Sequence, residues 1–315
     1  SIINADQIIN GNTPGDPALF TNDGEVTANT FDNQADGEVV NTGTLTAQVT
    51  NRVDGTFTTT GTIVGDVTNE GDLNAAGTIT GGIDNDAGTL IVTGDLLVNG
   101  ADGSLQNADG AEVQVTGGDL TVTSIDNDGD LTVGAGVQVT APGGTDNTAN
   151  GDLDILGTLV SNVDNTGLLD LIGGTLQGDL DNSGTANLDG TVTGTISNDD
   201  EINVAALASL DTGAAIENLS GGDLNVAGTI LDGVNNADGA TVDLTGGSIG
   251  ALDNAGTANL DGNVTGDLDN QATGVVTATG DVTVTGAVTN DNQMEFTLGG
   301  LDAASLTNTV DGTFT

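Results

Sequence analysis

A three-residue unit, in which an apolar residue and one further residue precede an asparagine, recurs along most of this 315-residue chain. Sixteen asparagines form the series: Asn33, Asn51, Asn69, Asn85, Asn107, Asn127, Asn147, Asn165, Asn182, Asn198, Asn218, Asn236, Asn254, Asn270, Asn290 and Asn308. Their mean spacing is about 18 residues, which is the period of a solenoid coil. Every gap but one is even. Even gaps keep a two-residue strand period in phase, because a slip of one residue turns every side chain to the opposite face.

The residues between the asparagines indicate strands rather than helices. In LDNSGTANLDGTVTG, residues 180–194, apolar or small side chains alternate with polar ones, and the stretch returns as LDNAGTANLDGNVTG at 252–266. Alternation is the period of a strand, whereas a helix needs apolar residues three and four apart. We therefore predict an all-β fold, a single-stranded parallel β-helix (β-solenoid) of about 17 coils of roughly 18 residues, with essentially no α-helix. At about 4.8 Å per coil the array would be a rod on the order of 80 Å long.

Two explanations account for the recurring asparagine. The side chain can sit at a corner of each coil and hydrogen-bond to its equivalents above and below, as amide ladders do in stacked strands. Alternatively, asparagine is there because it tolerates turn conformations better than most residues. The ladder is the favoured reading, and it makes the sixteen asparagines structural residues.

Residues 1–20 break the spacing and contain two of the three prolines, so we expect an N-terminal cap or lead-in segment, with Ile8-Ile9-Asn10 as an irregular first unit. Residues 21–315 form the predicted repeat domain. Within it, residues 140–152 contain the third proline and the one unit that begins with threonine, at Thr145. We expect a surface excursion there.

The composition excludes several classes of function. The chain has one basic residue, Arg52, against 47 acidic residues, for a formal net charge of −46, and it has no His, Cys, Tyr or Trp. It therefore has no cysteine nucleophile, no histidine base and no basic surface for nucleic acid or anionic lipid. It also has no apolar run long enough to insert into a membrane. We predict that it is not an enzyme, has no catalytic or cofactor-binding residues, and uses no cofactor beyond diffuse or weak Ca²⁺.

The best calcium candidate is still weak. Asp126, Asp128 and Asp130 alternate as at the start of an EF-hand loop, but the sixth position is Leu131 and the twelfth is Val137. Diffuse association of cations with an acid-covered surface is the stronger expectation. Threonine-rich stretches raise the alternative of ice binding, but their threonine pairs keep no fixed offset from the asparagine, so filling of exposed strand positions is favoured.

The units NTGTL at 41–45, NTGLL at 165–169 and NAGTANL at 254–260 resemble the repeats of bacterial autotransporter passengers and large haemagglutinin-like surface adhesins. The resemblance extends over residues 21–315. It implies a right-handed parallel β-helix, export to the bacterial cell surface, and an adhesive or matrix role.

The leading functional hypothesis is a non-enzymatic extracellular structural β-solenoid that acts as a rod, fibre or surface-layer component and assembles with itself end to end into filaments. The alternative is an adhesin or phage-fibre stalk that binds a surface glycan or, less favoured, ice. A polysaccharide-active enzyme is the least supported reading. The expected partners are therefore other copies of the chain, a glycan or a cell surface, and neither nucleic acid nor membrane.

Overall fold

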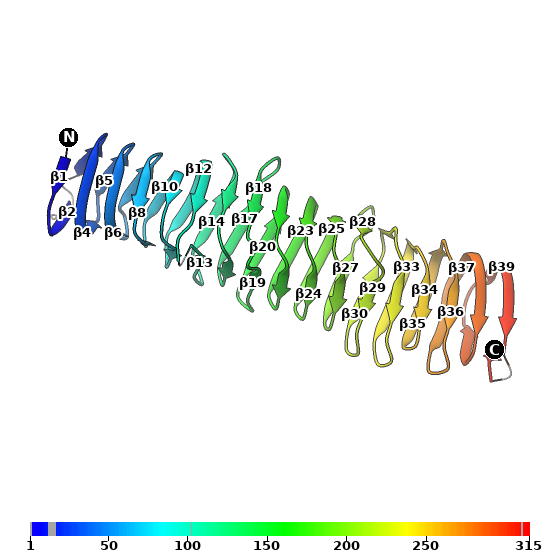
Figure 1. The fold of residues 1–315 in the computed structure, drawn as a ribbon. Helices are drawn as coiled ribbons and strands as arrows, with labels where there is room; N and C mark the ends of the chain where they lie inside the picture. Colours follow the sequence, from blue (N-terminus) through cyan, green and yellow to red (C-terminus); the bar gives the residue numbers. More distant parts are fainter. Residues whose placement is uncertain (1, 12–16, 102, 310) are drawn as a thin grey trace. The chain divides into compact units, whose positions relative to one another are not determined.

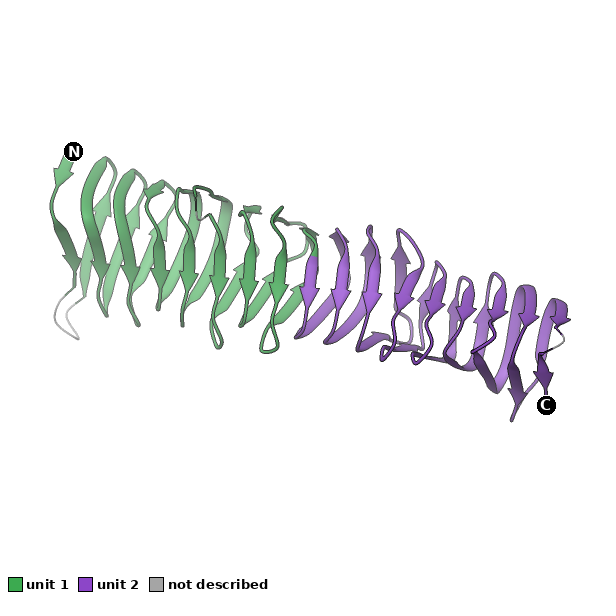
Figure 2. Ribbon diagram, turned by 60° about the horizontal axis from the view of Figure 1, so that its bottom comes forward, with its two compact units in different colours: residues 1–162 green, residues 163–315 purple. Residues whose placement is uncertain are grey.

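The computed structural model describes residues 2–11, 17–101, 103–309 and 311–315. These residues form strands, turns and bends and contain no helix, so none of them provides a helix that could span a membrane. The chain divides into two compact units, Ser1–Asn162 (unit 1) and Val163–Thr315 (unit 2), coloured separately in Figure 2. Each unit is a parallel β-solenoid whose strands lie side by side along the unit (Figure 1). This confirms the prediction of an all-β solenoid with about 18 residues per coil.

Each coil of unit 1 passes through three parallel sheets, which we call the first face, the second face and the ladder face. The first face contains β3 (Ala18–Asn22), β5 (Gly37–Asn41), β7 (Thr56–Thr59), the first halves of β10 (Asp72–Ile79) and β12 (Thr89–Val98), β14 (Glu112–Val115), β17 (Asp130–Val133) and β20 (Asp152–Ile155). The second face contains β1 (Ile2–Asn4), the first halves of β4 (Glu25–Asn33) and β6 (Thr44–Asn51), β8 (Thr62–Val64), the second halves of β10 and β12, β15 (Leu120–Thr121), β18 (Gln138–Thr140) and β21 (Thr158–Val160). The ladder face contains β2 (Gln7–Asn10), the ends of β4 and β6, β9 (Val67–Asn69), β11 (Ile83–Asn85), β13 (Leu105–Asn107), β16 (Ile125–Asn127) and β19 (Thr145–Asn147).

Unit 2 repeats the three faces. Its first face contains the first parts of β23 (Leu168–Gln177), β25 (Thr185–Val192), β33 (Thr241–Ile249), β35 (Thr257–Val264) and β37 (Val275–Asn290), together with β27 (Glu201–Val204), β30 (Asp223–Val226), β38 (Gln293–Phe296) and β40 (Thr313–Phe314). Its second face contains the following parts of β23, β25, β33, β35 and β37, with β28 (Ser209–Thr212), β31 (Thr229–Ile230) and the start of β39 (Leu301–Asn308). Its ladder face contains β22 (Val163–Asn165), β24 (Leu180–Asn182), β26 (Ile196–Asn198), β29 (Ile216–Asn218), β32 (Val234–Asn236), β34 (Leu252–Asn254), β36 (Leu268–Asn270) and the ends of β37 and β39.

The core of each unit is a stack of aliphatic side chains that point inward from all three faces. In β25, Ala186, Leu188 and Val192 are buried, whereas the residues between them are at least partly exposed. This is the two-residue period on which the strand prediction rests. Because strands of successive coils pair in register, each inward side chain packs on its equivalents in the coils before and after it.

The asparagines of unit 1 form a hydrogen-bonded ladder inside the ladder face. The Nδ2 of each one donates to the Oδ1 of the asparagine in the next coil at 2.7–2.9 Å, from Asn10 through Asn33 and onward to Asn147. An equivalent ladder in unit 2 runs from Asn165 to Asn308, also at 2.7–2.9 Å. Every bond within a ladder points in the same direction along the chain.

Backbone carbonyls use the remaining donor capacity of the amides. Asn51, which is 0% exposed, also donates to the carbonyl oxygens of Gly55 in its own turn and Asp72 in the next coil, at 3.1 and 3.0 Å. Glycine allows this close approach, because a Cβ added at Gly55 would lie 2.8 Å from the Oδ1 of Asn51. A buried amide is tolerated only when its donors and acceptor are paired in this way.

A second, shorter ladder lies on the first face of unit 1. Asn22 donates to Asn41 at 2.8 Å, and Asn41 donates to the hydroxyl of Thr59 at 3.1 Å. The residue in register with Thr59 in the next coil is Ala75, so the row continues as an apolar one. The spacing of the sixteen asparagines does not predict this ladder, although FTN and VVN, which end β3 and β5, are further examples of the same three-residue unit.

Residues 140–152, where we expect a surface excursion, contain the end of β18, all of β19 and the start of β20, and β19 pairs in register with β16. Thr145 fills an inward position there, where its hydroxyl donates to the Oγ of Ser161 at 2.9 Å. Within residues 1–20, Ile8-Ile9-Asn10, expected as an irregular first unit, pairs in register with β4. Residues 12–16 of the expected cap, which include Pro14, lie outside the described residues.

Substitution of the two adjacent asparagines of β32, Asn235 and Asn236, tests whether the ladder stabilises the fold. Replacing Asn236 by Ala leaves the Nδ2 of Asn218 and the Oδ1 of Asn254 without their buried partner, so we expect the free energy of unfolding to fall by about 2–5 kcal/mol. Asn235, which points outward and bonds to Glu217, is the matched control, and its replacement by Ala should cost no more than about 0.5 kcal/mol. Denaturant unfolding followed by circular dichroism measures both. Equal losses would contradict a stabilising ladder.

Candidate functional site

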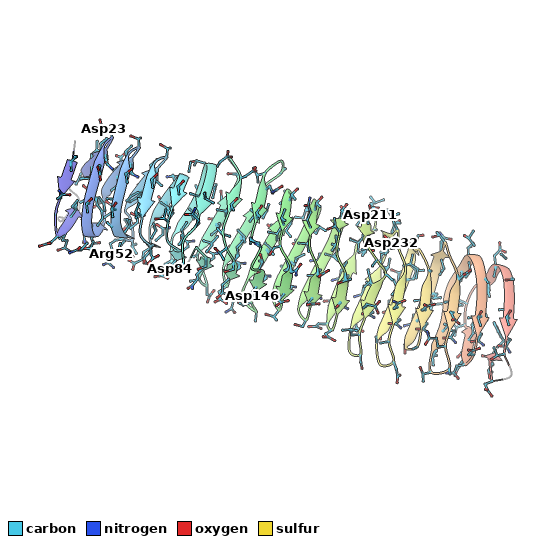
Figure 3. All side chains as sticks on the ribbon, viewed as in Figure 1. Asp23, Arg52, Asp84, Asp146, Asp211 and Asp232 are labelled. Atoms are coloured by element: carbon cyan, nitrogen blue, oxygen red, sulfur yellow. The ribbon has the colours of Figure 1, made fainter. Side chains whose placement is uncertain are left out.

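Several outward residues of the ladder face are acidic, and uncharged residues stand between some of them, such as Gln106 between Asp84 and Asp126. The central residue of each ladder strand points to solvent, and in-register pairing places Asp126 next to Asp146 in unit 1 and Asp253 next to Asp269 in unit 2. Paired strands are about 4.8 Å apart, which is well inside the Debye length of about 8–10 Å. Asp84 and Asp146 project from the same edge of unit 1 (Figure 3). Each unit therefore carries closely spaced like charges.

Partial burial and the close spacing of these aspartates raise the pKa of three of them, Asp84, Asp126 and Asp269. Partial burial, followed by repulsion from Asp128 and Asp146, raises the pKa of Asp126 above its ordinary value. Burial likewise raises the pKa of Asp84 and of Asp269, with smaller contributions from neighbouring aspartates. Both causes disfavour the charged carboxylate.

The chain's single basic residue, Arg52, forms ion pairs within unit 1. The Nε of Arg52 lies 3.0 Å from Asp32, and its Nη1 lies 3.5 Å from Glu70. These two acidic residues belong to the coils on either side of Arg52, so the guanidinium relieves repulsion at one point of the acidic surface. The side chain is 45% exposed, which makes it a weak, salt-sensitive contact.

The three calcium candidates do not converge. Asp126 lies on β16, and Asp128 follows in the turn, where it accepts a hydrogen bond from the hydroxyl of Thr148. Both line a hollow of about 80 Å³ that also contains Asp86 of an earlier coil. Asp130 begins β17 on the first face and does not line this hollow. No group of three or more acidic residues in the described ranges has an arrangement suited to a metal ion.

Single threonines stack in register on the second face of unit 1, although the Thr-x-Thr pair at Thr44 and Thr46 is not repeated in the next coil, where Val64 pairs with Thr46. Thr44, Thr62 and Thr78 are partners in successive coils, because their offset is constant when counted from the asparagine that follows them. Glu25 precedes this row, Leu97 interrupts it, and Thr121 and Thr140 continue it in the next two coils. The hydroxyl groups therefore form an interrupted single row rather than a continuous flat lattice.

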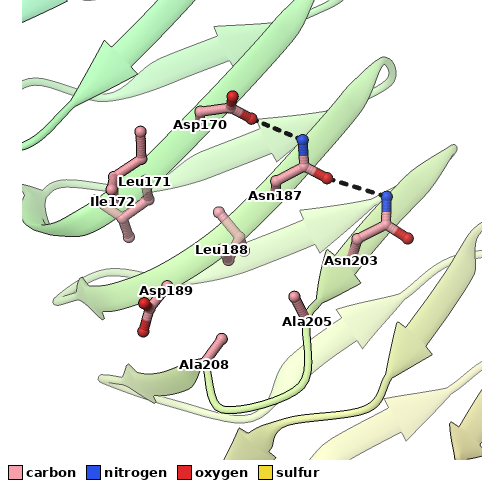
Figure 4. A pocket seen from close by; sticks show the side chains of 9 residues that line it. All are labelled: Asp170, Leu171, Ile172, Asn187, Leu188, Asp189, Asn203, Ala205 and Ala208. Carbon is pink, nitrogen blue, oxygen red and sulfur yellow. Dashed lines mark hydrogen bonds between the residues drawn. The ribbon is translucent and has the colours of Figure 1, made fainter.

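A groove of about 240 Å³ lies on the first face of unit 2 (Figure 4). Its lining residues come from β23, β25, β27 and the turn before β28; they are Asp170, Leu171, Ile172, Asn187, Leu188, Asp189, Asn203, Ala205 and Ala208. The groove exists because successive coils of unit 2 differ in length. The step from Asn182 to Asn198 is a short one, and the next step, from Asn198 to Asn218, is longer. The longer coil accommodates the turn at 205–208, which forms one wall.

A hydrogen-bonded polar row borders the groove. Asn187 donates to Asp170 at 2.6 Å, Asn203 donates to Asn187 at 3.1 Å, and Asn225 donates to Asn203 at 3.0 Å. These side chains point outward from the first face, so this is a surface counterpart of the buried ladder. No motif in the sequence marks the groove, because it depends on the turn length of one coil and the side chains of two others.

The fold and its ladders define the chain as a parallel β-solenoid repeat protein. No family model matches it, and a search of curated proteins finds no match. Among solved structures, the crystal structure of a TibC-catalysed hyper-glycosylated TibA fragment is similar over 99% of this chain and 98% of that one, with a TM-score of 0.32 and 15% identity. A likeness at this score carries no argument about function.

The raised pKa values predict a pH dependence of stability. The folded state holds protons on Asp84, Asp126 and Asp269 at a pH where the unfolded chain has lost them, so stability should increase as the pH falls from 7 through the raised pKa values towards the ordinary aspartate value. We expect a higher thermal midpoint at about pH 5 than at pH 7. Asp126→Asn should raise the midpoint at pH 7 and reduce the gain on acidification.

Asp109→Asn, at an exposed turn position of unit 1, is the control for loss of one charge. It should change the pH 7 midpoint less than Asp126→Asn does. A thermal midpoint that drops steadily between pH 7 and about pH 5 would contradict the raised pKa values of Asp84, Asp126 and Asp269.

Proposed function

We propose that this chain is a non-enzymatic structural protein of a bacterial cell surface or extracellular matrix, where the solenoid acts as a spacer, fibre or surface-layer segment. The observation that supports this most directly is the repetition of the same buried amide bond from coil to coil within each unit. A structure whose stabilising contact recurs in every coil can be lengthened by duplication without a new core, and the near-identical stretches at 180–194 and 252–266 are what such growth leaves behind.

The side-chain chemistry supports a non-catalytic role. The chain has no histidine or cysteine, and the described residues include no cluster of three or more acidic residues that could hold a metal ion. Its carboxylates are distributed along the faces rather than gathered around one cavity. An enzyme requires reactive groups with different, matched protonation states at a single place.

The direction of the ladder supports end-to-end assembly of copies. Because every Nδ2 donates towards the following coil, a second copy added in the same orientation would extend the ladder and all three parallel sheets together. The opposite orientation would bring two donors or two acceptors face to face. Head-to-tail contacts of this kind are heterologous and produce open filaments.

Electron microscopy of the purified chain at physiological salt tests the structural role. We expect stiff particles on the order of 80 Å long, or filaments built from them. Flexible coils, or a hydrolytic activity on polysaccharides, would contradict the proposal. Asn308→Asp removes the amide donor that would face the next copy, so it should shorten filaments; Asp302→Asn, on the same strand, is the control for the change in charge.

An adhesin or phage-fibre stalk that binds a surface glycan is the second candidate. The groove on the first face of unit 2 favours it, since a ligand site requires a concave place with polar groups. Ice binding receives less support, because the in-register threonines form a single row that Leu97 interrupts.

We expect Ca²⁺ to associate diffusely with the acidic surface rather than to occupy a specific site. Cations that screen the acidic rows should raise the thermal midpoint when NaCl, Mg²⁺ or Ca²⁺ is added to chelator-treated protein in dilute buffer. A variant with Asp126, Asp128 and Asp130 all replaced by Asn should keep most of the Ca²⁺ response, and Mg²⁺ should act about as well as Ca²⁺. A Ca²⁺-specific increase that this variant abolishes would instead assign these three residues to a calcium site.

A further inference from the structure

The groove on the first face of unit 2 combines an apolar surface with two carboxylates. Leu171 and Leu188 are core residues that reach its floor, and Ile172, Ala205 and Ala208 line its sides (Figure 4). Ile172 is 50% exposed, which is high for a large aliphatic side chain on a strand. Such a surface favours contact with a hydrocarbon chain, because both surfaces then leave water.

The two carboxylates lie at different edges of the groove. Asp170 accepts a hydrogen bond from the Nδ2 of Asn187 at 2.6 Å, on the side of the polar row. Asp189 accepts from the backbone N–H of Ser209 at 2.9 Å, beside the projecting turn. Both donors are neutral, so neither contact compensates the negative charge.

No side chain of the protein can supply that compensation. The chain contains neither lysine nor histidine, and its one arginine, Arg52, pairs with Asp32 and Glu70 in unit 1. A cation at Asp170 or Asp189 must therefore come from solution. The groove has no aromatic ring to hold a quaternary ammonium group, whereas a primary ammonium carries three donors that suit carboxylate oxygens.

We propose that this groove binds a linear aliphatic diamine. The methylene chain lies against Ile172, Leu188 and Ala208, and the two ammonium groups bind to Asp170 and Asp189. This assigns a ligand class to one place on the solenoid, in addition to the structural role proposed above, and either conclusion can fail without the other.

The internal duplication provides a natural comparison. In the second copy of the repeat, Asn259 donates to Asp243 at 2.6 Å, as Asn187 does to Asp170, and Asp261 occupies the register of Asp189. Thr245, however, replaces Ile172.

The wall of the second copy differs as well. Thr279, Gly280 and Asp281 stand where the first copy has the turn at 205–208, and the carboxyl group of Asp261 lies against Gly280. The second copy thus keeps the charges and loses the apolar walls, so we expect it not to hold the diamine.

Isothermal titration calorimetry of the full chain tests the proposal at fixed ionic strength. The probes are diamines from 1,4-diaminobutane to 1,6-diaminohexane, with 1-aminobutane as the single-charge comparison. We expect one saturable site per chain for at least one diamine, above a diffuse background, and weaker binding of the monoamine. Asp189→Asn keeps the acceptor for Ser209 and should weaken binding about fivefold, as expected for one ion pair.

Asp261→Asn removes the same charge from the second copy and should leave the saturable affinity within about twofold. Ile172→Ser tests the apolar wall without a change in charge and should also weaken binding. Thermal unfolding of each variant verifies that it is folded. The absence of saturable binding for every diamine, or equal weakening by Asp189→Asn and Asp261→Asn, would overturn the proposal and leave only diffuse counterion association.

Discussion

The amide hydrogen bond between successive asparagines is the interaction on which this fold depends. An aliphatic core allows coils to slide or rotate over one another, because packing of Leu, Ile and Val has little directionality. The buried amides remove that freedom. Asn51 is fully buried and forms bonds to the coils before and after it, so a slip in register would leave donors and acceptors unpaired at several coils at once. The ladder therefore sets the register, and the core supplies most of the burial.

The acidity of the chain conflicts with this stacking. Parallel in-register strands place each outward residue above its equivalent, so the arrangement that aligns the asparagines also aligns Asp126 with Asp146. Partial burial is the main cause of the raised pKa of Asp126, and repulsion from Asp128 and Asp146 adds to it. A chain of this kind is best suited to surroundings whose ions screen its faces, which agrees with the proposed extracellular setting. Its high net charge also opposes sideways aggregation of the exposed sheets.

The groove shows how a uniform repeat can acquire a local site. Where a short step between ladder asparagines is followed by a longer one, the longer coil cannot superimpose on the shorter one, and its additional residues project as the turn at 205–208. Steps of the same lengths recur in the second copy, but there the longer coil turns at 271–274, before the first face, and β37 continues without a turn where the first copy has 205–208. The apolar groove therefore depends on the place of the turn together with Ile172 and the alanines of that turn.

The sequence alone determined the fold class, the coil length and the asparagine series, because contacts in a solenoid join residues at a nearly constant separation and so appear as a period. Only the tertiary structure showed that residues 140–152 stay in the coil, that Asn22, Asn41 and Thr59 form a second ladder, and that Asp130 lies on a different face from Asp126. It also brought Asp170, Ile172 and Asp189 together around one groove. These features depend on which residues of neighbouring coils come into register, and the unequal lengths of successive coils change that register from one step to the next.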